Sequence, residues 1–153
     1  MKSLFSDFFD TFHWLCCVSN TSNVDMVLSK AKEREREYDW LGALELYRNA
    51  LSMAPEQNVS KAAEIHELMG YGFFRASRQP DSMEEFKKRM QASFESYGKA
   101  AELFEKAEPT RALYCRTMAK YSNFWLAEDP SKKKELLDDC LRLLKEALMS
   151  FDA

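Results

Sequence analysis

Histidine and cysteine are the side chains that most often act as bases, nucleophiles or metal ligands, and this chain of 153 residues has two histidines and four cysteines. Neither His13 nor His66 stands at metal-binding spacing from a cysteine or from the other histidine. Cys16 and Cys17 are adjacent, whereas the cysteines of a zinc or redox pair are separated by two residues. The spacing therefore predicts no metal site and no cofactor, and His66 is interpreted as a partly buried helix residue.

Phosphate-binding and acid–base patterns give no sign of catalysis either. The Gly-Tyr-Gly run at 70–72 lies inside a helical pattern, without the preceding strand and following lysine of a phosphate loop. Neighbouring carboxylates on a helix point about 100° apart and cannot share one site, which applies to the pairs Glu84 with Glu85 and Asp138 with Asp139. We therefore expect that the protein is not an enzyme.

Composition indicates an all-α protein. Only four glycines are present, 46% of the residues are hydrophobic, and helix-forming residues dominate. The 22 basic and 25 acidic residues are interleaved, so the chain carries no strong field that would attract nucleic acid. Cys115 and Cys140 fall on apolar helical stripes, where a free cysteine behaves as a small hydrophobic residue. This cysteine usage favours a reducing, cytoplasmic setting.

Four prolines divide the chain into periodic segments, because proline is tolerated only in loops or in the first turn of a helix. Three- and four-residue spacing of apolar side chains within the segments predicts amphipathic helices. The expected helical segments are 24–37, 38–55, 60–76, 82–107, 110–127 and 131–151. Two apolar faces on 110–127 indicate a helix packed on both sides, and the glycines at 70 and 72 suggest a close approach between helices.

Residues 1–22 are expected to form a separate N-terminal helix and linker ahead of a helical domain at 23–153. Aromatic side chains recur at helical steps here, and the apolar run is shorter than the roughly 20 residues that span a membrane. We interpret the segment as a helix that caps the core or docks on another surface. Its candidate interface residues are Phe5, Phe8, Phe9, Phe12 and Trp14.

The segment at 38–55 carries a more specific pattern, in which small, aromatic and proline residues follow at fixed offsets: Ala43, Tyr47, Ala50, Leu51 and Pro55. Ala31 lies one helix earlier, and similar spacing returns at 100–107 and 140–147. This pattern resembles the tetratricopeptide repeat, although the later copies do not keep that family's period of about 34 residues. The resemblance implies antiparallel helical hairpins stacked as a short α-solenoid of about seven helices.

The same resemblance implies a non-catalytic scaffold whose partner is another protein or a peptide. Candidate polar residues for a peptide groove are Lys32, Glu35, Arg36, His66 and Arg75. One binding mode of the family grips a terminal carboxylate with lysine and asparagine. Here Leu28 replaces an expected lysine and Lys32 stands in place of an asparagine, so this mode is not expected.

Two other functions fit the sequence. The chain could be a structural subunit that self-associates, as a homo-oligomer or in a larger assembly, through its N-terminal aromatic residues or through Leu143, Leu148 and Phe151. The pattern at 30–51 also resembles the three-helix microtubule-interacting and trafficking domain, which implies a trafficking adaptor. That domain is shorter and leaves the last two helices unexplained.

Overall fold

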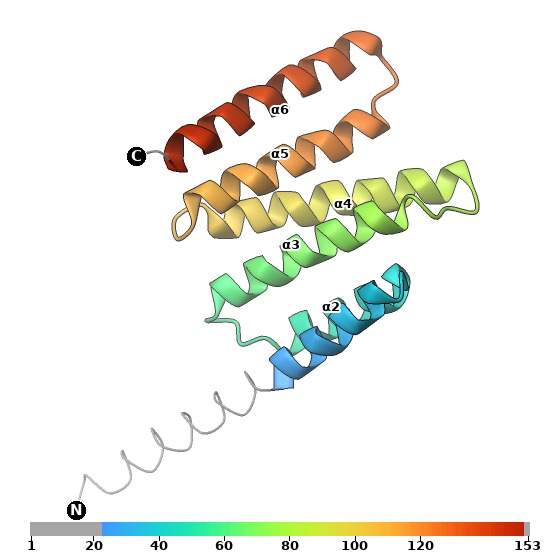
Figure 1. Ribbon diagram of the computed structural model, residues 1–153, viewed down its shortest axis with the longest axis vertical. Helices are drawn as coiled ribbons and strands as arrows, with labels where there is room; N and C mark the ends of the chain where they lie inside the picture. Colours follow the sequence, from blue (N-terminus) through green and yellow to red (C-terminus); the bar gives the residue numbers. More distant parts are fainter. Residues whose placement is uncertain (1–22, 152–153) are drawn as a thin grey trace, which may run out of the picture.

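The computed structural model describes residues 23–151, which form a stack of helices without any strand in this range (Figure 1). Six helices lie in the described range, and from α2 onward each packs on the next in sequence. They are a helix through 23–36, α2 (Trp40–Met53), α3 (Val59–Ala76), α4 (Met83–Phe104), α5 (Pro109–Leu126) and α6 (Pro130–Phe151). The all-α prediction is confirmed, whereas the N-terminal helix and interface residues expected within 1–22 lie outside the described residues.

Local side chains and prolines fix where the helices begin. The side chains of Asp39, Asn58 and Ser82 each accept a hydrogen bond from a backbone N–H in the first turn of α2, α3 and α4, at 3.0–3.1 Å. Pro109 and Pro130 begin α5 and α6, where the missing N–H costs nothing. The expected segments therefore agree closely with the observed helices, except that α4 ends at Phe104 and not near residue 107.

Two groups of buried side chains form the core, and α3 contributes to both. One group joins the helix at 23–36 to α2 and α3, and includes the predicted stripe residues Ala31, Ala43, Tyr47 and Ala50. The other joins α3, α4 and α5 around Tyr97 and Phe104. The small residues of the stripe let neighbouring helices approach closely, while the larger ones fill the space between them.

The glycines of α3 lie at close contacts with other helices, which confirms the predicted close approach. A Cβ atom on Gly70 would lie 2.7 Å from the ring of Tyr97 on α4, and one on Gly72 would lie 3.1 Å from Leu44 on α2. Both positions are buried in the middle of a helix. Close packing therefore offsets the cost of about 1 kcal/mol that glycine imposes on a helix relative to alanine.

We predict that G70A lowers the free energy of unfolding by about 1–2 kcal/mol, because overpacking against Tyr97 outweighs the gain in helix propensity. The matched control is G98A on α4, where an added Cβ meets no other atom within 4 Å. This control should raise the free energy by about 0.5–1 kcal/mol. Urea unfolding of the two variants measures both effects, and equal shifts would contradict the close contact at Gly70.

Candidate functional site

The C-terminal turn of α3 places the side chain of Arg75 against aromatic rings. Its guanidinium carbon lies 4.7 Å from the ring centroid of Trp40 and 5.7 Å from that of Tyr71. Arg75 Nη1 also donates a 2.9 Å hydrogen bond to the hydroxyl of Tyr71. Stacking on aromatic faces holds a guanidinium in place and leaves its remaining N–H groups able to bind an acceptor.

Arg78 is held in a similar way where α3 ends. Its guanidinium carbon lies 5.2 Å from the ring centroid of Phe74 and 5.1 Å from that of Trp125 on α5. The residue as a whole is exposed. The stacked side chain thus bridges α3 and α5 while its N–H groups remain accessible to solvent.

Arg75 and Arg78 line one hollow of about 550 Å³, which we call the arginine hollow. Its walls come from α3 and from the turn that leads into α2. The full lining is Tyr38, Trp40, Phe74, Arg75, Arg78 and Gln79. Two cations and three aromatic rings in one concavity can bind a group that carries negative charge beside an apolar side chain.

Neither arginine of the hollow makes an ion pair with any residue that the structure describes. By contrast, carboxylates of the chain pair with Arg34, Arg89, Arg111, Arg116 and Arg142. Arg111, for example, places its Nε 2.6 Å from Glu67 Oε2. The positive charge of the hollow is therefore not neutralised by acidic groups within 23–151.

Tyr38 adopts a backbone conformation that tyrosine rarely takes, with φ at +60°. It follows the helix at 23–36, and its N–H donates to Glu35 O while the next N–H, of Asp39, donates to Arg34 O, both at 3.0 Å. Glycine is usual at this position of such a helix end. A tyrosine here carries a conformational cost, and its side chain lines the arginine hollow while 66% exposed.

Aromatic rings continue from the hollow across α5. Phe74 lies 5.9 Å from Tyr121, whose ring is 6.1 Å from both Phe124 and Trp125. Lys133 of α6 lies over the ring of Phe124 at 5.6 Å. The hollow is thus one end of a wider aromatic surface that carries cationic side chains, spread over α3, α5 and α6.

The structure does not bring all five predicted groove residues into the arginine hollow. Lys32 and Arg36 are exposed on the helix at 23–36, and no hydrogen bond or ion pair among the described residues joins them to His66 or Arg75. Glu35 is half-buried, and burial together with this carboxylate raises the pKa of Tyr47. Only Arg75 of the five residues lines the arginine hollow.

His66 lies in the middle of α3, half-buried and away from the hollow. Burial and the nearby Lys99 lower the pKa of His66. This side chain therefore favours its neutral form, as a partly buried helix residue should.

Sequence reasoning did not identify Tyr38, Arg78 or Trp125 as site residues. The only signal for Arg78 is that it is a second arginine three residues after Arg75, just beyond the end of the helix. The pairing with Trp125 depends on how α3 and α5 lie, which no local pattern gives. The strained backbone at Tyr38 likewise has no signal in the sequence.

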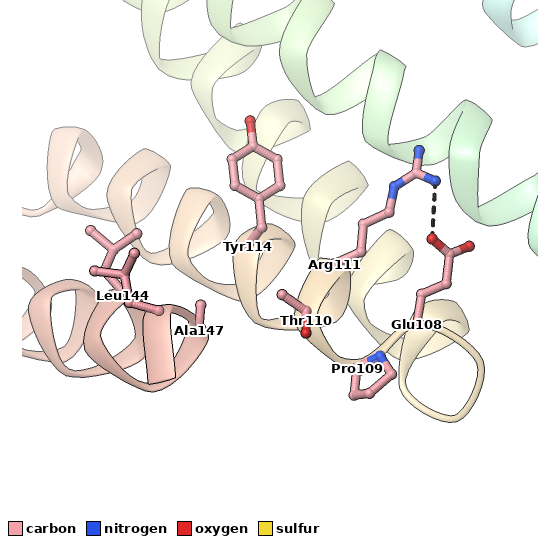
Figure 2. Close-up of a pocket in the computed structure, with 8 residues that line it drawn as sticks. Glu108, Pro109, Thr110, Arg111, Tyr114, Leu144 and Ala147 are labelled. Carbon is pink, nitrogen blue, oxygen red and sulfur yellow. Dashed lines mark hydrogen bonds and ion pairs between the residues drawn. The ribbon is translucent and has the colours of Figure 1, made fainter. Parts of the chain in front are cut away.

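A second concavity lies between α5 and α6 and is mainly apolar (Figure 2). It has a volume of about 570 Å³, with Pro109, Thr110 and Tyr114 on α5 and Leu144 and Ala147 on α6. Leu148 also lines it, while Glu108 and Arg111 pair with each other at one end, at 3.3 Å. We call this the α5–α6 groove.

The structure also gives specific findings on metal ligands, thiols and membrane spans for the part of the chain that it describes. This part contains no group of three or more His, Cys, Asp or Glu side chains that could hold a metal ion. Cys115 and Cys140 are buried, and burial raises the pKa of the Cys115 thiol to about 12, so these thiols are protonated at neutral pH. Within 23–151, no helix combines the length and apolar character that crossing a membrane requires.

The fold and the arginine hollow define an all-α protein with an exposed cationic and aromatic surface. Comparison with models of protein families, with curated proteins and with solved structures found no match to this chain.

We predict that Y38G raises the free energy of unfolding by about 0.5–1 kcal/mol, because glycine adopts a positive φ without the steric cost that tyrosine bears. The control Y38F keeps both the ring and the backbone cost, so its stability should equal that of the parent. Urea unfolding measures both variants. Destabilisation by Y38G would mean that the ring contributes more to the fold than the backbone conformation costs.

Proposed function

We propose that this protein is a non-catalytic helical scaffold that binds an acidic segment of another protein in the arginine hollow. One observation carries the proposal: Arg75 and Arg78 stack on aromatic rings in a single hollow and have no carboxylate partner within 23–151. A guanidinium held by stacking loses little further freedom when it binds a carboxylate. An acidic peptide would supply the missing partners.

The aromatic rings favour a particular kind of segment. Trp40 is buried under Arg75, whereas Tyr38 lines the hollow with 66% of its surface exposed and Trp125, 36% exposed, lies against Arg78. Tyrosine, tryptophan and arginine dominate binding energy at protein interfaces. We therefore expect the segment to place an aspartate or glutamate next to an apolar side chain, so that the carboxylate meets the arginines and the apolar group meets the rings.

The arrangement of helices supports a scaffold of tetratricopeptide-like type. Successive helices pack on one another in sequence order, and the small and aromatic residues that carry the resemblance form the core between the helix at 23–36, α2 and α3. Stacks of helical hairpins expose long surfaces suited to binding extended segments. In this proposal the binding surface runs from the arginine hollow along the aromatic rings of α3 and α5.

We predict that short peptides rich in aspartate and glutamate with one aromatic or leucine residue bind the full chain, and that their asparagine and glutamine counterparts do not. R75Q and R78Q should each weaken binding about tenfold, because each removes a charge-assisted hydrogen bond of about 1.5 kcal/mol. Fluorescence anisotropy of the labelled peptides in solution measures these affinities. The affinities should also fall as salt concentration rises.

The matched control is R48Q. Arg48 also lies over an aromatic ring, that of Phe73 at 5.4 Å, but it is exposed on α2 and does not line the hollow. It should leave peptide affinity unchanged, and circular dichroism should show that all three variants remain folded. Equal losses in R48Q, R75Q and R78Q would instead indicate non-specific attraction to positive charge and contradict the proposed site.

A further inference from the structure

The last helix, α6, carries two apolar stripes, and only one of them is covered. Leu136, Cys140 and Leu143 are buried on the side that faces α5. A second stripe is exposed, with exposed fractions of 39% for Leu137, 57% for Leu141, 43% for Leu144 and 65% for Leu148. We call these four leucines the outer stripe. Large apolar side chains gathered along one helix in this way mark an interaction surface.

The outer stripe has the spacing of a helix–helix seam. Its leucines follow one another at steps of four, three and four residues, which is the heptad repeat of the a and d positions in a coiled coil. Leu144 and Leu148 also line the α5–α6 groove together with Tyr114, which is 42% exposed. A helix that packs on the outer stripe would therefore cover the groove as well.

The order of the stack favours an antiparallel direction for that helix. Successive helices from α3 to α6 alternate in direction, and each lies beside the next (Figure 1). A helix that extended the same packing beyond α6 would run antiparallel to α6. A second α6, related by a two-fold axis, meets this condition, since it would place Leu141 opposite Leu144 and Leu137 opposite Leu148 of the other copy.

In this antiparallel arrangement, the charged residues beside the outer stripe of one copy are complementary to those of the other copy. Leu137 and Leu144 occupy the d positions of the heptad. Asp138 and Lys145 come directly after them, so both lie on the same side of the stripe, away from α5. In an antiparallel pair, Asp138 of one copy faces Lys145 of the other. The two-fold axis generates a second, equivalent contact between Lys145 of the first copy and Asp138 of the second. Both residues are exposed, and neither makes an ion pair with another described residue.

We infer that the outer stripe of α6 binds the outer stripe of a second copy of this chain in an antiparallel pair flanked by two Asp138–Lys145 contacts. Four leucines from each copy form a small interface, so the dimer depends on protein concentration. This surface lies apart from the arginine hollow, and R75Q or R78Q should leave the dimer unchanged. The test of the dimer is therefore independent of the test of the proposed peptide binding.

We predict a reversible monomer–dimer equilibrium of the full chain in sedimentation velocity over roughly a hundredfold range of concentration. L141D should leave only monomer, because it places a carboxylate at the centre of the stripe in each copy. The matched control is L41D on α2, where the leucine is 52% exposed and belongs to no such stripe. L41D should dimerise like the parent, and circular dichroism should confirm that both variants are folded.

Charge reversal tests the direction and register of the pair. D138K and K145D each create two repulsive contacts across the axis, and each alone should raise the dimer dissociation constant about tenfold. A mixture of the two variants should form a heterodimer with the affinity of the parent, because every contact is then complementary. The double variant D138K/K145D should also dimerise like the parent.

Four results would overturn the inference. The chain could remain monomeric across the whole concentration range, or its dimer could survive L141D unchanged. Alternatively, single charge reversals could leave the dimer intact, which would exclude the antiparallel register. A dimer that is lost in F8D/F12D but kept in L141D would place the contact in the N-terminal segment and also overturn it.

Discussion

The contact between Gly70 of α3 and Tyr97 of α4 is the constraint on which the arrangement of helices depends. The ring of Tyr97 is buried directly against the backbone at Gly70, where no larger residue fits. This approach also lets Ser93 Oγ donate a 2.9 Å hydrogen bond to Gly70 O, while Ser93 Oγ pairs at 3.0 Å with Ser122 Oγ on α5. Buried polar groups need such partners, so three helices are held at a fixed spacing.

The position of α3 then determines the surface that the protein presents. The helix α3 packs between α2 and α4 and also reaches α5. Its last turns therefore contact aromatic rings of both α2 and α5. Arg75 contacts Trp40 of α2, and Arg78 contacts Trp125 of α5. Each arginine is thus fixed by an aromatic ring from a different helix, which keeps both guanidinium groups in the same hollow.

The two exposed surfaces of the molecule differ in physical character. The arginine hollow combines fixed positive charge with aromatic rings, and in the proposed function it selects a partner by charge as well as by shape. The outer stripe of α6 is composed of leucines, and the inferred dimer gains its stability mainly from removing their apolar area from water. In the inferred dimer the charges beside that stripe set the direction and register of the pair, as flanking residues do in coiled coils.

The sequence by itself determined the local structure of the described part of this protein. Apolar spacing, capping residues such as Ser82 and prolines such as Pro109 located the helices, because these signals act within one or two turns. The glycines of α3 indicated a close packing contact with neighbouring helices. The role of Arg75 in binding stays a prediction. The seventh helix and the aromatic residues expected within 1–22 stay predictions.

Only the tertiary structure decided which of these residues share a site. Arg75 was brought to Tyr38 and Arg78, while Lys32, Arg36 and His66 were placed elsewhere. The rings of Trp40 and Trp125 are far from α3 in sequence, and they reach its arginines because the helices pack at distances set by buried glycine and tyrosine. Such contacts depend on the spacing between helices, and that spacing is a property of the whole core and not of any local stretch of residues.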